Sequence, residues 1–174
     1  MQTLFDAPEI EYLDGRPYPK MSPKTAHSMT QTALVLLLRD LAGKRGRAGT
    51  EWHFRIGAVD GTDTVFVPDV AYVAIERLRA LSGEDREEPP IAPDIVAEVR
   101  SKGESARLRR EKIARYRATG TLIVLDVDPQ TRTIAVHGAG VPQVYESGDN
   151  FVSSEIPWLT FDVDRVFADL DFDA

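Results

Sequence analysis

The chain has 174 residues, of which 43% are hydrophobic and 28% are charged, and it contains no cysteine. Its length suggests one domain, expected over residues 1–174, with a core of its own. Its composition is typical of a soluble globular protein and excludes a disordered one. The lack of cysteine excludes a disulfide scaffold, a thiolate zinc site and a cysteine nucleophile. The formal net charge of −7 argues mildly against a partner as acidic as nucleic acid.

The N-terminal segment MQTLFDAPEIEYLDG has acidic residues where a signal peptide would have a basic start and an apolar centre. The longest apolar run, residues 33–38, is far too short to span a bilayer. We therefore expect a cytoplasmic protein without a membrane partner.

Turn and helix signals dominate the first 42 residues. Asp14-Gly15 between two short apolar pieces predicts a tight hairpin of residues 9–13 and 16–21. Apolar residues that recur every four positions predict a helix over residues 22–42.

Strand-like segments fill most of the remaining chain. They are expected over residues 49–58, 64–75 with an interruption at Pro68-Asp69, 91–99, 121–127, 133–137 and 143–146. The nearly continuous apolar run at 121–127 indicates a central strand. Residues 76–90 are expected to form a loop, 104–119 a basic helix, and the segment 158–170 a short closing helix. This order predicts an α/β or α+β fold with a mixed sheet.

Three charged residues lie in apolar surroundings. Asp69 lies within VFVPDVAYVAI and Glu98 within PDIVAEVRS, while Lys112 shares a helix face with Leu108 and Tyr116. A buried carboxylate is costly unless it is paired or binds a cation. Two strand carboxylates and a lysine suit metal-assisted phosphodiester hydrolysis. The carboxylates would hold Mg²⁺, the metal would activate a water molecule, and the lysine would position the water or stabilise the transition state.

Other interpretations of these residues stay open. Each carboxylate taken singly is also consistent with an edge residue or a local turn anchor. His53 and His137 have no spaced partner, which argues against a zinc site. The sequence has no Gly-x-Ser-x-Gly elbow and no glycine-rich phosphate loop, which argues against hydrolase-triad and nucleotide-kinase functions.

Basic residues gather in one segment. Residues 100–117 contain eight basic and two acidic residues, a charge of +6, so the rest of the chain carries −13. The segment predicts a phosphate-backbone track beside the metal site, whose nucleic-acid contacts are expected from Lys102, Arg107, Arg109 and Arg110. The alternative is a solvated helix face balanced by the acidic residues at 84–88. The net charge thus averages two opposed regions and does not exclude a nucleic-acid partner.

Several strings together carry a family resemblance. VPDVAYV is followed by APDIVAEVRS, by a helix with Lys112, Tyr116 and Gly120, and by an apolar strand that ends in Asp-x-Asp-Pro. Upstream, EYLDG and MSP precede His27 at the start of the long helix. In this order and spacing the chain resembles the Uma-two family of restriction-endonuclease-like proteins, within the PD-(D/E)XK nuclease superfamily, over nearly its whole length.

The resemblance implies a restriction-endonuclease-like fold, in which a mixed central sheet is flanked by helices and preceded by an N-terminal hairpin. It also implies a Mg²⁺ or Mn²⁺ site built by Asp69 and Glu98, with Lys112 as the catalytic lysine and Glu11 as a nearby acid. His27 has a counterpart in the family as well, although a histidine in the first turn of a helix often only caps it or faces solvent.

The sequence departs from the family pattern just after Glu98. The lysine position of the E-x-K pattern holds Arg100, which strand alternation places on the same face as Glu98. Because an arginine stays protonated, we expect Arg100 to bind or stabilise the phosphate rather than to take a proton. Lys102 stands where the family usually has proline and adds another basic group.

These observations predict a Mg²⁺-dependent endonuclease that hydrolyses phosphodiester bonds of nucleic acid, with DNA expected rather than RNA. A catalytically inactive nucleic-acid-binding or accessory module on the same fold is the alternative. A structural or toxin–antitoxin type partner protein ranks third. Restriction-like folds often dimerise so that two sites cut two strands, so a homodimer is compatible with this prediction.

Overall fold

A computed structural model describes residues 10–13, 15–19, 24–59, 62–101 and 103–171 of the chain. Within these residues the largest sheet has six strands, in the spatial order β10 (Gln143–Tyr145), β9 (Thr133–His137), β8 (Ile123–Asp128), β7 (Ile95–Val99), β6 (Val70–Ala74) and β3 (Gly46–Thr50). Only β7 and β8 pair in parallel, and the other neighbours in this sheet are antiparallel. The sheet is therefore mixed, as the sequence predicts.

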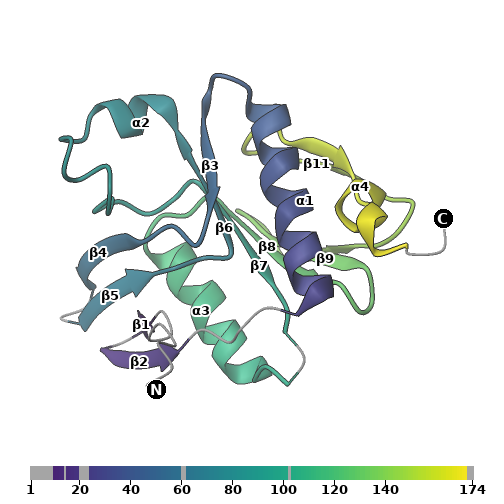
Figure 1. Ribbon diagram of the computed structural model, residues 1–174, viewed down its shortest axis with the longest axis horizontal. Helices are drawn as coiled ribbons and strands as arrows, with labels where there is room; N and C mark the ends of the chain where they lie inside the picture. Colours follow the sequence, from purple (N-terminus) through teal and green to yellow (C-terminus); the bar gives the residue numbers. More distant parts are fainter. Residues whose placement is uncertain (1–9, 14, 20–23, 60–61, 102, 172–174) are drawn as a thin grey trace, which may run out of the picture.

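Two helices cover the two faces of this sheet (Figure 1). The apolar side of α1 (Thr25–Ala42) packs against one set of strand residues, among them Ile95 and Ala97 of β7. The apolar side of α3 (Ala106–Ala118), which connects the parallel strands β7 and β8, packs against the alternate set, including Val96. All five residues of β7 are buried because the strand is covered from both sides.

A second sheet lies against the α3 side of the molecule (Figure 1). Its strands have the order β2 (Arg16–Pro19), β1 (Ile10–Leu13), β5 (Thr62–Phe66) and β4 (Phe54–Val59). Phe54, Phe66 and Leu13 of this sheet share a core cluster with Ile113 and Tyr116 of α3. The antiparallel pair β1–β2 confirms the predicted hairpin over residues 10–13 and 16–19, while its predicted residues 9, 20 and 21 lie outside the described ones. The packing of this sheet fixes the hairpin beside α3.

The C-terminal part adds a short hairpin of β11 (Asn150–Val152) and β12 (Thr160–Asp162). It is followed by α4 (Asp164–Phe167) and a 3-10 turn, Ala168–Leu170, both of which pack against α1. None of the helices in the described part of the chain is long and apolar enough to cross a membrane.

Two of the predicted segments were wrong, and one hairpin was not predicted. The expected strand at 49–58 is divided between β3 and β4, which lie in different sheets, because the chain turns at Glu51 with a positive φ of 50°. The expected loop at 76–90 begins with a short helix, α2 (Ile75–Arg79). The hairpin of β11 and β12 was not predicted. The interruption at Pro68-Asp69 is confirmed, since β5 ends at Phe66 and β6 begins at Val70.

Gly46 in β3 lies so close to the side chain of Tyr72 that a side chain at position 46 would not fit. A Cβ atom at this position would overlap the ring of Tyr72, which is buried and packs edge-on against Trp158 at 5.0 Å. We expect Gly46→Ala to lower the free energy of unfolding by about 1–3 kcal/mol, measured by urea denaturation, because the core is overpacked. Gly49→Ala in the same strand is the control, since its nearest neighbour would be 3.8 Å away. Equal stability of the two variants would contradict this packing.

Candidate active site

Asp69 lies at the break between β5 and β6, where Pro68 ends the preceding strand. The residue is 3% exposed, and its Oδ2 accepts a hydrogen bond from the backbone N–H of Val99 at 2.7 Å. The backbone oxygen of Asp69 accepts from Nε2 of Gln31 at 2.8 Å. The loop that carries this carboxylate is therefore held both by β7 and by α1.

Glu98 faces the same region from β7. The antiparallel register pairs Val70 with Ala97, so continuing it by one residue places Asp69 opposite Glu98. Side chains of directly opposed residues lie on one face of a sheet. Glu98 is 3% exposed, and both carboxylates line the same pocket. Asp69 and Glu98 therefore meet in space as the sequence analysis expects.

Lys112 reaches these carboxylates from α3. Its Nζ lies 2.9 Å from Oε2 of Glu98 and 2.7 Å from Oε2 of Glu11, which comes from β1. Burial alone would lower the pKa of Lys112, but the attraction of Glu98, Glu11 and Asp69 outweighs it and holds the pKa above its ordinary value of 10.5. The ammonium group is therefore positively charged at neutral pH in the metal-free site.

Glu11 is fixed on both sides. Its Oε1 accepts from the backbone N–H of Val67 at 3.0 Å, and its Oε2 contacts Lys112. These two contacts tie the N-terminal hairpin to the end of β5 and to α3. Glu11, the nearby acid that the family resemblance implies, thus contacts Lys112 directly.

Tyr116 completes the group, although the sequence analysis gave it no role at the site. Its fully buried hydroxyl donates to Oε1 of Glu98 at 2.6 Å. Burial and the nearby carboxylates of Glu98 and Glu11 raise the pKa of this hydroxyl well above its ordinary value of 10.0, so it remains a donor. The signal was present in the sequence, because Tyr116 lies four residues after Lys112 on the same helix face.

Tyr116→Phe is expected to lower the free energy of unfolding by about 1.5–3 kcal/mol, because a buried carboxylate loses a hydrogen bond. The ring contact with Phe66, at a centroid distance of 4.4 Å, remains in the variant. Tyr145→Phe is the matched control: its hydroxyl bonds Gln143 at the surface, and we expect a change within about 0.5 kcal/mol. Both variants are measured by urea unfolding, and similar losses would contradict a special role for the Tyr116 hydroxyl.

His27, in the first turn of α1, lies at the same site. Its Nε2 is 3.6 Å from Oδ2 of Asp69, beyond hydrogen-bond distance, and its Nδ1 is 3.2 Å from Oγ of Ser101. His27 is buried and therefore does not simply face solvent.

The pocket around these groups has a volume of about 330 Å³. It is lined by Glu11, Leu13, Tyr18, His27, Asp69, Glu98, Val99, Ser101, Gly103, Glu104, Ser105, Leu108 and Lys112. Its walls come from the β1–β2 hairpin, the start of α1, Asp69 before β6, and the stretch that runs from the end of β7 into α3.

The side chains of this pocket fit a divalent cation of the magnesium type. Asp69 and Glu98 offer carboxylate oxygens, the ligands that Mg²⁺ prefers. Among the described residues no group of three or more His, Asp or Glu side chains is arranged to enclose an ion. Mg²⁺ commonly binds through one or two carboxylates, water and substrate phosphates.

The structure corrects the predicted role of Arg109 as a nucleic-acid contact. Its side chain is 4% exposed and bonds Asp126 at 2.6 Å, Glu104 at 2.8 Å and the backbone oxygen of Glu98 at 2.7 Å. Interaction with Asp126 and the other acids outweighs burial and raises the pKa of Arg109. A buried guanidinium with three partners supports the sheet and is not available to phosphate.

The other basic candidates lie in different places. Arg100 lies outside the pocket, drawn toward β8 by Asp128 at 3.0 Å and Asp126 at 3.5 Å. Arg107 and Arg110 are exposed on the outer side of α3, where Arg107 pairs with Glu111 at 3.5 Å. Lys102 lies outside the described residues. Fewer basic side chains are therefore exposed for contact with a phosphate than the charge of residues 100–117 suggested.

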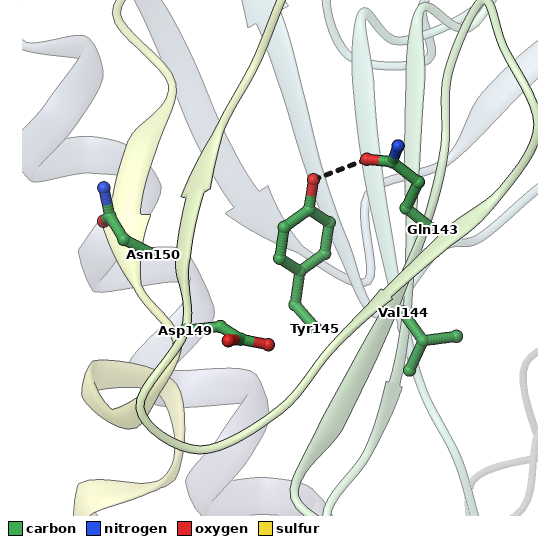
Figure 2. A pocket seen from close by; sticks show the side chains of 5 residues that line it. All are labelled: Gln143, Val144, Tyr145, Asp149 and Asn150. Carbon is green, nitrogen blue, oxygen red and sulfur yellow. Dashed lines mark hydrogen bonds between the residues drawn. The ribbon is translucent and has the colours of Figure 1, made fainter.

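A second pocket, of about 390 Å³, lies between the C-terminal strands (Figure 2). Its lining residues are Gln143, Val144, Tyr145, Asp149 and Asn150. Figure 2 shows the hydroxyl of Tyr145 directed at the side-chain oxygen of Gln143, with which it forms a 2.7 Å hydrogen bond. None of the predicted site residues lines this second pocket, whereas several of them line the first one.

A mixed sheet whose neighbouring strands bring two carboxylates to a helix lysine defines a protein of the restriction-endonuclease-like class. Residues 2–164 match the family model Uma2, described as "Putative restriction endonuclease". The chain belongs to this family, as the sequence resemblance indicates.

A solved structure supports the fold. The chain is similar to the crystal structure of a protein from Anabaena variabilis described as "a putative nuclease belonging to DUF820". The TM-score is 0.78, the sequence identity is 23%, and the match covers 92% of this chain and 90% of that one. No curated protein sequence matches the chain.

Proposed function

We propose that the protein is a metal-dependent endonuclease that hydrolyses phosphodiester bonds, with Mg²⁺ or Mn²⁺ as its cofactor and DNA as its substrate. One observation carries this proposal: Asp69, Glu98, Glu11 and Lys112 meet in a single buried pocket. The proposal includes a cytoplasmic location. Two further statements remain predictions: that the chain forms a single domain over residues 1–174, and that it forms a homodimer.

The charge of the pocket explains why a cation is needed. The carboxylates of Asp69, Glu98 and Glu11 together with Lys112 carry a formal charge of −2, which repels a phosphate. Glu104 also lines the pocket, and its carboxylate is paired with Arg109. A divalent cation on Asp69 and Glu98 would cancel this charge. When bound, such a cation also lowers the pKa of a coordinated water and neutralises charge on the phosphate.

The chain's own residues then have separate tasks. In the metal-free site the neighbouring carboxylates hold the pKa of Lys112 above its ordinary value, and we expect Lys112 to supply a positive charge for the transition state. Glu11 and Tyr116 act as positioning residues, because one bonds Lys112 and the other bonds Glu98. Arg107 and Arg110 are exposed on the outside of α3, which supports the proposal that they contact the phosphate backbone beyond the pocket.

Metal removal tests this function. We expect the purified protein to cut plasmid or oligonucleotide DNA in the presence of Mg²⁺ or Mn²⁺, to lose cutting when EDTA is added, and to regain it when the cation is restored in excess. Cutting that continues in EDTA would contradict the proposal. Binding of DNA without cutting at either cation would favour the inactive nucleic-acid-binding module instead.

A further inference from the structure

The pocket has a chemically divided lining. Its charged side chains are those of Glu11, Asp69, Glu98, Glu104 and Lys112, and its lining also includes the apolar or aromatic side chains of Leu13, Tyr18 and Leu108. Tyr18 and Leu108 are partly buried and pack against the core cluster beneath the second sheet, so both are held in place without being fully covered. Such a lining suits a ligand with a charged group at one end and a flat apolar face at the other.

The hairpin register places Tyr18 next to the charged side chains. Tyr18 is the direct cross-strand partner of Glu11, whose carboxylate contacts Lys112. Directly opposed residues project on the same face of the sheet, so Tyr18 flanks the site. Tyr12, its neighbour in the same hairpin, projects on the other face, is 37% exposed and does not line the pocket.

The depth and size of the pocket limit what can reach the carboxylates. Glu11, Asp69 and Glu98 are 5%, 3% and 3% exposed, so a reacting phosphate has to enter the pocket to reach them. A volume of about 330 Å³ is at the lower end of the roughly 300–1,000 Å³ of small-molecule sites. It admits a group the size of one nucleotide, whereas in an intact duplex each nucleotide is stacked and paired to a second strand.

Resting on the proposed nuclease function, we propose that the site acts on single-stranded nucleic acid, or on a strand locally unpaired. The base of the reacting nucleotide stacks on Tyr18 beside Leu108, and its phosphate lies at Asp69 and Glu98. Stacking on an aromatic side chain binds any base and needs no sequence readout. Unpaired DNA and unpaired RNA both satisfy this chemistry, and paired strands have to be opened first at a cost in free energy.

The first test compares one labelled oligonucleotide alone and annealed to its complement, with wild-type protein and Mg²⁺ or Mn²⁺. We expect the single strand to be cut at least tenfold faster than the blunt duplex. A duplex cut as fast as the single strand overturns the inference and supports the nuclease function. Absence of both cutting and binding, for either form, overturns the proposed function together with the inference.

The second test measures binding by fluorescence anisotropy in the non-cutting variant Asp69→Asn. We expect Tyr18→Ala to weaken single-strand binding about tenfold, and Tyr18→Phe and Tyr12→Ala to bind as the parent does. Single-strand binding unchanged by Tyr18→Ala, or weakened equally by Tyr12→Ala, overturns the stacking role. Preferential single-strand binding by the wild type without cutting supports the ligand class and overturns the nuclease function. The wild-type comparison decides the ligand class even if Tyr18→Ala does not fold.

Discussion

Asp69→Asn and Glu98→Gln are each expected to reduce metal-dependent cleavage by roughly a thousandfold, because each removes a charged ligand of the cation that activates water and neutralises the phosphate. The rate of cleavage of a labelled oligonucleotide in Mg²⁺ measures the effect. In the Asp69→Asn variant the side-chain amide oxygen can still accept the hydrogen bond from the N–H of Val99, so the fold is expected to survive.

Asp94→Asn is the matched control for these two variants. Asp94 is also buried, but it bonds Arg77 at 2.6 Å and the backbone N–H of Ala74 at 2.7 Å, outside the pocket. We expect this substitution to lower stability and to leave the cleavage rate close to that of the wild type. Cleavage by Asp69→Asn or Glu98→Gln at the wild-type rate would show that these carboxylates do not hold the catalytic cation.

Lys112→Met is expected to lower the free energy of unfolding by about 3–5 kcal/mol, because it leaves Glu11 and Glu98 buried without their shared cation. A methionine has nearly the same length, so the packing of α3 changes little. Urea unfolding at neutral pH measures the loss. Arg110→Met on the exposed side of α3 is the control, and we expect a change within about 0.5 kcal/mol.

The dependence on pH has a definite sign. The folded state holds the pKa of Lys112 above 10.5, so the ion pairs contribute their full stability at lower pH and lose it only as the pH rises through the raised folded value. The wild type should therefore lose no stability through deprotonation of Lys112 between pH 7 and 9. Adding Glu98→Gln to Lys112→Met should restore part of the loss, since one buried charge is removed. Full stability of Lys112→Met would contradict the buried ion-pair arrangement.

The sequence predicts those parts of the fold that depend on local signals. The Asp-Gly hairpin, the four-residue apolar period of α1 and the proline before Asp69 each determine a structure within a few residues. The apolar run of β8 also identifies a central strand. By contrast, β11 and β12 have three residues each, too few for a periodic pattern.

The candidate site depends on long-range pairing, which local patterns do not contain. Asp69 and Glu98 meet because β6 and β7 pair in one register, and only the family resemblance related them beforehand. The prediction that Arg109 contacts nucleic acid was wrong for a physical reason that is partly visible in the sequence. Asp126 lies within an apolar central strand, so it needs a buried cation, and Arg109 provides it.

The most direct test of the proposed site is the position of a bound cation. Crystals grown or soaked with Mn²⁺ and measured for anomalous scattering locate the metal independently of any activity. We predict a single strong peak in direct contact with carboxylate oxygens of both Asp69 and Glu98, and no such peak in crystals of Asp69→Asn. A peak elsewhere, or no peak at these two residues at saturating Mn²⁺, would contradict the proposed metal site.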